Sequence, residues 1–398
     1  MPTDDPAKYT SAARARIAAQ GFRGLRMRSV AQEAGASLGS LNHHVGDKAA
    51  LIAAIVREER RERQLQHALW RRRVACLDLT DATVLAAAIA TYLDEAALVH
   101  RAMALTGCEL LVEAVMAPQE FPGIDLLLAD EQRLWVDLLA PGYGSDADLF
   151  GRAIVGYCHD ERPFTIALAG HADYRLLRSA TIASVSAGLA GRGDGLAARF
   201  GDLVAACGSD PAVSPLPVDL PDGSKKAELA QHIAQVIAEQ GVSAVTHRAV
   251  AARAGVSNSR IAHHFRTQAD LLDAGFGALI LAMRQEMRSL DLPEPERHRG
   301  MAMIRATHSI ALVAARDPAL QPFALDMRRR RSENVRERLR GMLGGDRAAD
   351  DATLQAVSMM TIGSGFAAMA SGGADGRSAI TVEQLAGLRR RFLAARSG

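Results

Sequence analysis

The chain has 398 residues, 48% of them hydrophobic and 4% aromatic, with 47 Lys and Arg against 45 Asp and Glu. This length exceeds one compact helical domain, so we expect two or more. The net charge of +2 is too small to indicate a nucleic-acid partner by itself. No basic segment followed by an apolar run marks a signal peptide, and no stretch reaches about 18 uninterrupted apolar residues. We therefore expect a cytoplasmic protein with no membrane partner.

The four cysteines lie far apart in the chain and form no CxxC pair. This spacing favours reduced, mostly buried thiols over redox sensing. The residues are Cys76, Cys108, Cys158 and Cys207.

Residues 29–48, which follow a predicted helix over 9–20, predict a short helix, a tight turn and a second short helix. The first short helix ends at Gly35, where a left-handed residue closes a helix at low cost, and Ser37 can cap the second. The second helix buries Leu41 and has a small, polar outer face, which suits entry into a DNA major groove. That face carries Leu38, Gly39, Ser40, Asn42 and His43.

The same pattern recurs 220 positions later, where residues 249–268 repeat residues 29–48. Between residues 17–56 and 237–276, 15 of 40 aligned positions are identical, including both His-His pairs. Such self-similarity is the signature of an internal duplication. Residues 8–48 carry seven basic and two acidic side chains, and residues 225–268 carry six and two. Each copy therefore has the local basic surface that phosphate binding needs.

Both copies resemble the DNA-binding module of the tetracycline-repressor (TetR) family. The shared pattern runs from an amphipathic helix ending in Gly, through V-A-x-x-A-G-x-S, to a His-His pair. The resemblance implies an all-α fold in which each helix-turn-helix domain precedes a helical ligand-binding and dimerisation domain. It also implies a double-stranded DNA operator and a small-molecule effector as partners.

The residues expected to contact DNA lie in both modules. They are Arg28, Ser37, Leu38, Gly39, Ser40, Asn42, His43 and Lys48 in the first, and Thr246, Arg248, Ser257, Asn258, Ser259, Arg260 and His263 in the second. Arg26 stands where the family usually has a helix-capping Thr, which the second copy keeps as Thr246. Gln268 stands where the family usually has a phosphate-binding Lys, kept here as Lys48. We expect the second module to bind DNA less tightly.

The remaining residues of the first half predict helices and no strand, over 83–99, 103–116, 124–139, 148–159 and 174–189. The charged stretch 57–73 favours a solvated helix face with pairs such as Glu59–Arg63 over direct DNA contact. Polar and polarisable side chains on these helices and their second-half counterparts suggest an effector site. The candidates are Met103, Cys108, Glu109, Trp135, Tyr157, His159, His308 and Met359.

Residues 208–224 hold four prolines in 17 positions and predict an extended linker. The second half then predicts helices over 227–239, 270–290, 301–315, 320–343, 352–371 and 382–395. The expected domains are therefore 1–56, 57–207, a linker 208–224, 225–276 and 277–398. Pro118 and Pro122 recur as Pro318 and Pro322, at a shift of 200, so we expect the ligand-binding domain to be duplicated too.

No nucleophile elbow, phosphate-binding loop or HExxH sequence occurs, so we expect neither an enzyme nor a cofactor. The adjacent histidines of each pair point about 100° apart on a helix, which argues against a metal site.

Family members are typically homodimers, and here we expect the dimer within one chain, with residues 148–189 packed against 352–395. Further oligomerisation remains open at this point. The alternative is a ligand-binding or scaffold protein whose modules no longer bind DNA.

Overall fold

The computed structural model describes residues 6–190, 195–208, 220, 223–287, 294–333, 335–344, 349–373 and 379–395, without the side chains of residues 23, 243, 280 and 283–303. Within these ranges the chain is helical, with short 3-10 and π turns and no strand. The expected all-α fold is confirmed. Most of the expected linker, 209–219 and 221–222, lies outside the described residues.

The first half begins with a module of four helices and continues as a helical bundle. Its elements are α1 (Pro6–Gln20), η1 (Phe22–Gly24), α2 (Met27–Glu33), α3 (Leu38–His44), α4 (Lys48–Val74), α5 (Ala82–Asp94), η2 (Glu95–Val99), α6 (Arg101–Ala114), η3 (Pro118–Glu120), α7 (Ile124–Tyr143), η4 (Gly144–Asp146), α8 (Ala147–Leu168), α9 (Ala172–Ser186), η5 (Ala197–Arg199) and α10 (Phe200–Ala206). Aspartates cap two of the longer helices, as expected for a side chain that accepts from free N–H groups: Asp47 begins α4 and Asp81 begins α5.

The second half repeats this order with fewer residues. Its elements are α11 (Lys225–Gln240), η6 (Val242–Ala244), α12 (His247–Ala254), α13 (Asn258–His264), α14 (Gln268–Met287), α15 (Glu294–Ala314), η7 (Pro318–Leu320), α16 (Gln321–Arg329), α17 (Arg336–Met342), α18 (Asp351–Ala370) and α19 (Val382–Ala395). Ser224 caps α11 and Asp350 caps α18.

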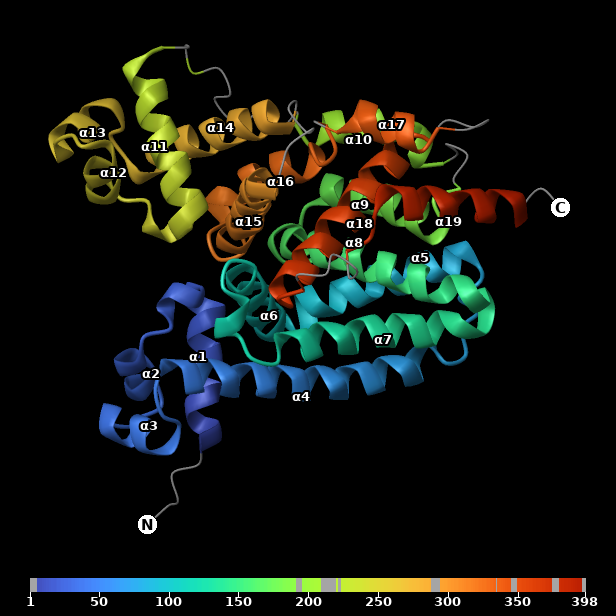
Figure 1. The fold of residues 1–398 in the computed structure, drawn as a ribbon, viewed down its shortest axis with the longest axis horizontal. Coiled ribbons are helices and arrows are strands. Elements are labelled where there is room, and N and C mark those ends of the chain that lie inside the picture. The colour runs from blue at the N-terminus through green and yellow to red at the C-terminus, as the bar shows by residue number, and fades with distance from the viewer. Residues whose placement is uncertain are drawn as a thin grey trace.

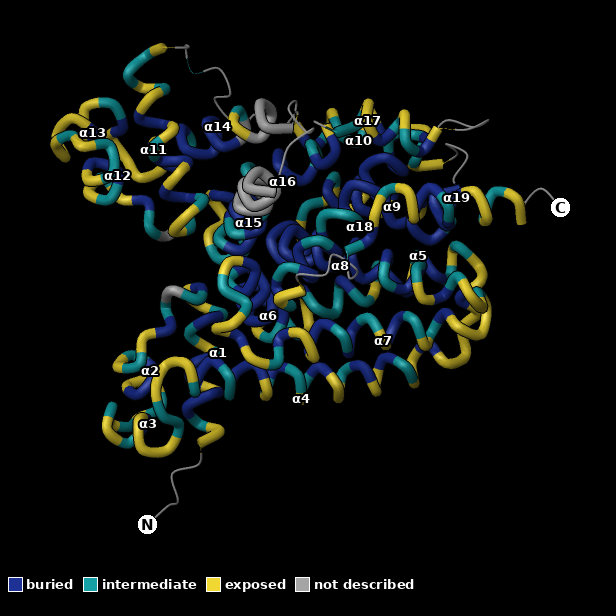
Figure 2. The backbone as a smooth tube through the Cα atoms, in the orientation of Figure 1, coloured by how far each residue is buried: buried dark blue, intermediate teal, exposed yellow. Residues whose placement is uncertain are grey.

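Both modules lie on the same side of the helical body, with α3 and α13 at its outer edge (Figure 1). Helix α6 contacts α1 of the first module, α15 contacts α11 of the second, and α6 and α15 contact each other. Buried residues concentrate along α8 and α18, whereas α3 and α13 are largely exposed (Figure 2).

The two halves share their hydrophobic cores. One core joins the second module to Phe164 and Tyr174 of the first half. Another joins the first module to Leu312 and Phe366 of the second half, and the third contains residues of both halves throughout. Among the described residues, each of these three cores therefore contains side chains of both halves.

The expected packing of residues 148–189 against 352–395 is confirmed. Helices α8 and α9 both contact α18, and α8 also contacts α19. Glycines allow the closest approach: a Cβ atom on residue 363 would lie 1.9 Å from the carbonyl oxygen of Gly156. The two backbones are therefore in direct contact at this crossing.

The structure differs from the sequence-based expectations in four details. The single helix over 320–343 is instead α16 and α17, separated by Ser332 at φ 78°. The helix expected over 148–159 continues to Leu168, and α10 was not expected at all. The stretch 57–73 is not simply a solvated face, because Glu59 is 0% and Arg63 9% exposed. Periodicity in one helix did not reveal that long partner helices cover these positions.

Residues 82–99 form a helix long and apolar enough, by composition alone, to cross a membrane. In the structure this segment packs against α9, and its Leu85, Ile89 and Leu93 lie in a hydrophobic core. The buried positions of this segment pack within the protein, whereas its Leu98 and Val99 are 69% and 68% exposed.

Candidate nucleic-acid interface and the cavity behind it

The first module forms the helix-turn-helix that the sequence predicts. Gly35 adopts φ +64° after α2, and the Ser37 hydroxyl accepts from the Ser40 N–H at 3.0 Å to begin α3. Leu41 is fully buried, while Asn42 and His43 are exposed. Helix α3 therefore presents polar side chains outward on a helix whose start is fixed by a local cap.

Two residues expected on the reading face of α3 are engaged inside the module. Leu38 is half-buried against the core. The Ser40 hydroxyl lies 2.7 Å from that of Tyr9 on α1. The freely exposed positions among those expected to read bases are thus Gly39, Asn42 and His43.

The second module has the same geometry with a more polar outer face. Ser257 caps α13 by accepting from the Arg260 N–H at 3.3 Å, and Gly255 adopts φ +64°. Ile261 is buried like its counterpart Leu41. The side chains expected to meet DNA are all exposed here: Ser257, Asn258, Ser259, Arg260 and His263.

The modules differ at the start of their second helices, as expected. Thr246 accepts from the Ala249 N–H at 3.1 Å and so caps α12. Arg26 stands at the same place before α2 and makes no capping bond. Arg28 and Arg248 are both exposed beside these caps.

Lys48 and Gln268 occupy the first positions of α4 and α14. Lys48 is exposed, and its Nζ lies 5.5 Å from the centre of the Phe22 ring. Gln268 instead donates to the carbonyl oxygen of Val245 at 3.2 Å. Only the first module therefore offers a cation at this position.

In each module, the two adjacent histidines contact each other through their rings. His43 and His44 stand edge to face at 4.9 Å, and His263 and His264 at 5.3 Å. His44 also stacks on Tyr9 at 6.3 Å. Over the described residues, no group of three or more His, Cys, Asp or Glu side chains is placed to hold a metal ion.

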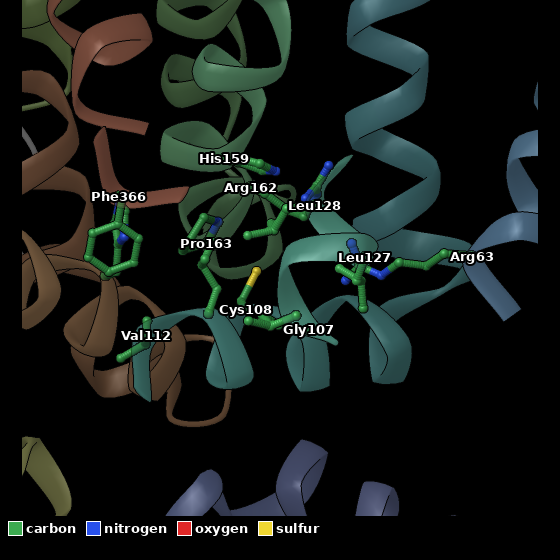
Figure 3. A pocket seen from close by; sticks show the side chains of 13 residues that line it. Arg63, Gly107, Cys108, Val112, Leu127, Leu128, His159, Arg162, Pro163 and Phe366 are labelled. Carbon is green, nitrogen blue, oxygen red and sulfur yellow. The ribbon is translucent and has the colours of Figure 1, made fainter. Parts of the chain in front are cut away.

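A small cavity lies behind the first module, where α4, α6, α7, α8, α15 and α18 meet (Figure 3). Its volume of about 10 Å³ is close to the room that one ordered water needs. Nitrogen-bearing side chains and Cys108 share its wall with apolar ones. The lining is Arg63, Gly107, Cys108, Leu111, Val112, Ile124, Leu127, Leu128, His159, Arg162, Pro163, His308 and Phe366.

Two polar atoms of this lining lack hydrogen-bond partners in the part of the chain that the structure describes. They are Nε of Arg63 and Nδ1 of His159, both shielded from solvent. Arg63 lies across Gly107 so closely that a Cβ there would be 1.7 Å from its Nη2. Burial raises the pKa of the Cys108 thiol to about 11, so the thiol is protonated at neutral pH.

Three of the expected effector residues, Cys108, His159 and His308, line this cavity. The other five lie outside its lining. Glu109 accepts from the Phe22 N–H at 3.1 Å, Tyr157 donates to Glu161 at 2.9 Å, and Trp135 packs edge to face on Tyr92. Met359 is fully buried in a core, and Met103 is half-buried on α6.

Next to the cavity lies a buried charge network that sequence patterns did not reveal. Glu131 of α7 accepts from Tyr92 at 2.9 Å and pairs with Arg162 and, at 3.2 Å, with His159. Burial opposes the charge of Glu131, yet the Arg162 guanidinium and the hydrogen bond with His159 hold its pKa well below the usual range. The network is fully formed only in the tertiary structure because its members come from distant segments.

Two further carboxylates of α8 pair across the halves. Asp160 accepts from Arg331 at 2.6 Å and from His308 at 2.8 Å. Burial alone would raise the pKa of Asp160, but Arg331 and His308 outweigh it and lower that pKa to about 2. Glu161 pairs with Arg328 at 2.6 Å, and both side chains are fully buried. The only sequence signal was the cluster of four consecutive arginines at 328–331.

Over the described residues, these features define an all-helical protein with two exposed helix-turn-helix modules. Residues 10–55 and 231–274 each match the family model described as bacterial regulatory proteins, tetR family. The matches run from within α1 to the start of α4, and from within α11 to the start of α14. No curated protein matches the chain. Each half of the chain therefore carries a TetR-type DNA-binding module, and the two modules support a TetR-type DNA-binding transcription regulator.

Proposed function

We propose that one chain binds one operator as an intramolecular pseudo-dimer. The supporting observation is that both halves contribute to every hydrophobic core while both modules lie on one side of the body (Figure 1). A single folded chain thereby presents two recognition helices, as a homodimer of separate chains would. Sizing the protein–DNA complex by light scattering tests this, because two chains on one minimal operator would contradict it.

The operator is proposed to be asymmetric because the two reading faces differ. The Asn42 amide of α3 can form hydrogen bonds with adenine, whereas Arg260 of α13 can donate a hydrogen bond to guanine from each of its two terminal nitrogens. Both side chains are exposed. Each such contact discriminates by about 1–3 kcal/mol, enough for each half-site to prefer its own sequence.

Selection of binding sites from a random DNA library tests the asymmetry. Arg260→Ala should relax base preference in one half-site only. Arg253→Ala is the matched control, because Arg253 pairs with Glu239 at 2.6 Å within the same module and away from α13. A palindromic consensus would contradict the proposal, as would loss of preference in both half-sites.

We further propose that an effector enters the cavity lined by Cys108, His159 and His308 and releases the protein from DNA as a repressor. The two nitrogens that lack hydrogen bonds, Nε of Arg63 and Nδ1 of His159, would then find hydrogen-bond partners on the ligand. Because the cavity now has room for about one water, binding must move its lining. Such a regulator acts on DNA in the cytoplasm.

A panel of small carboxylic acids, amides and amines, screened for release of bound operator, tests the effector site. Cys108→Met should fill the cavity and abolish release while keeping DNA binding. Cys158→Ala is the control, because Cys158 is buried in another core. Equal release of operator from both variants would show that the effector binds elsewhere in the protein. Failure of the wild-type chain to bind any selected DNA would favour the alternative, a ligand-binding or scaffold protein.

A further inference from the structure

Helix α15 of the second half touches both DNA-binding modules through two arginines. Arg316, just beyond its end, donates from Nε to the carbonyl oxygen of Ala18 at 2.7 Å and from Nη2 to that of Ile17 at 3.0 Å. Both carbonyls belong to the last turn of α1, where intrahelical donors run out and cations are favoured. Arg316 therefore caps the first helix of the opposite half's module.

A carboxylate of α6 holds the same junction from the other side. Glu109 accepts from Arg316 at 2.7 Å and from the Phe22 N–H at 3.1 Å. Glu109 is 8% exposed, so this contact is shielded from solvent. The end of α1 and the start of η1 are thus fastened to an ion pair that joins the two halves.

Arg305 of α15 makes the corresponding contact with the second module. Its Nη1 donates to the carbonyl oxygen of Ala238 at 3.0 Å, in the last turn of α11. Its Nη2 pairs with Glu113 of α6 at 3.1 Å, and its Nε donates to the carbonyl oxygen of Val112. With 5% exposure, the guanidinium is enclosed between the second module and α6.

The two fastened positions are equivalent in the repeat, because Ala18 and Ala238 differ by 220 residues. The helices that fasten them have diverged. At the shift of 200, Glu109 and Glu113 of α6 align with Ser309 and Val313, and Arg305 and Arg316 align with Leu105 and Met116. Helix α6 carries the acids and the α15 segment the arginines, a division that two identical subunits cannot make.

We propose that these two Arg–Glu pairs, Arg305–Glu113 and Arg316–Glu109, fix the distance between the modules and so set which half-site spacing the chain accepts. The inference rests on the proposed operator binding. Its residues are positioning residues that need not touch DNA. Each added base pair rotates a half-site by about 35° around the duplex, so a fixed module distance discriminates sharply between spacings.

The module distance can be measured without DNA by pulsed electron spin resonance on the full chain. Spin labels are placed at Gln32→Cys and Ala252→Cys, which are equivalent, exposed and away from α3 and α13. Cys76, the exposed native cysteine, is replaced by Ser, since the other three are buried. The parent should give a narrow distance distribution, and Arg305→Met and Arg316→Met should each broaden it about twofold or more.

Two further variants separate fastening from general stability. Arg305→Lys keeps a charge beside Glu113 but loses the fork that reaches three acceptors, so it should broaden the distribution to a smaller extent. Arg391→Met removes another ion pair between the halves, with Asp146 at 2.7 Å, that touches neither module. That control should leave the distribution unchanged. Unchanged distributions in Arg305→Lys, Arg305→Met and Arg316→Met would overturn the proposal.

Operators with half-sites moved apart one base pair at a time give the second measurement. The parent should prefer its best spacing by about tenfold or more over a neighbouring one, and the Arg305 and Arg316 variants should reduce that ratio to about threefold or less. Their affinity for an isolated half-site should stay within about twofold. An unchanged spacing preference would also overturn the proposal. If the parent binds no operator, the proposed function fails, while the distance distributions still decide on the fastening.

Discussion

Gly156 and Gly363 bring the backbones of the two halves into contact. A Cβ atom on residue 363 would lie 1.9 Å from the carbonyl oxygen of Gly156, and one on residue 156 would lie 2.5 Å from that of Met360. Backbone atoms cannot yield as a flexible side chain does, so helices α8 and α18 depend on these glycines for their spacing.

Gly363→Ala should therefore destabilise the protein by about 3 kcal/mol or more, because α8 and α18 must move apart. Gly365→Ala is the matched control in the same helix: its Cβ would meet nothing within 4 Å. That change should stabilise by about 0.5–1 kcal/mol through helix propensity. Urea denaturation measures both. Equal effects of the two substitutions would show that the crossing tolerates separation.

The pair between Glu161 and Arg328 predicts strong coupling between the halves. Arg328→Met leaves Glu161 buried without its cation and should cost about 3–5 kcal/mol. The double variant Glu161→Gln/Arg328→Met should recover part of that loss, since no unpaired charge remains. Denaturation of the parent, the two single variants Glu161→Gln and Arg328→Met, and the double variant gives the coupling energy. Strictly additive losses would contradict the pairing.

Because the His67 side chain is buried, we expect the protein to lose stability as the pH falls. Burial lowers the pKa of its imidazole from the ordinary 6.5 to about 4. The unfolded chain therefore takes up a proton below about pH 6.5 that the folded chain takes up only near pH 4. The free energy of unfolding should fall between these values by up to about 3 kcal/mol. His67→Gln should flatten this dependence between pH 7 and pH 4.5, and an unchanged slope would contradict it.

The two modules should differ in salt dependence because Lys48 aligns with Gln268. Lys48→Gln should weaken binding to all sequences and reduce the slope of log affinity against log salt by about one unit. Gln268→Lys, the reciprocal change, should increase the slope by about one unit. Fluorescence anisotropy over a salt series measures both. If neither variant shifts the slope, this position does not meet phosphate.

Because α2 lacks a capping side chain, we expect that supplying one stabilises the first module. Arg26 has extended backbone angles, φ −114° and ψ 127°, suited to a capping side chain, yet makes no cap bond. Arg26→Thr should stabilise the first module by about 1 kcal/mol, and Thr246→Ala should destabilise the second by a similar amount. Hydrogen exchange of the amides in α2 and α12 reports each module separately. If Arg26→Thr fails to stabilise α2, or Thr246→Ala fails to destabilise α12, the two capping positions are not equivalent.

The sequence by itself determined the local features of this protein. The helical periodicity, the glycines at 35 and 255 and the caps at Ser37, Ser257 and Thr246 each depend on residues a few positions apart. The duplication was equally visible, since a shift of 220 aligns both modules. Local backbone energetics and repetition are properties that a chain shows before it folds.

Only the tertiary structure decided which charged residues are buried and what they hold. From the sequence, Glu59 and Arg328 are expected to be solvated. A charged side chain can be buried only where other groups compensate its charge, and these groups are often far away along the chain. Glu161 and Arg328 are 167 residues apart, and Arg316 and Ala18 are 298 apart. Such contacts form only once the two halves have packed around shared cores. They surround the cavity and hold both DNA-binding modules against the helical body.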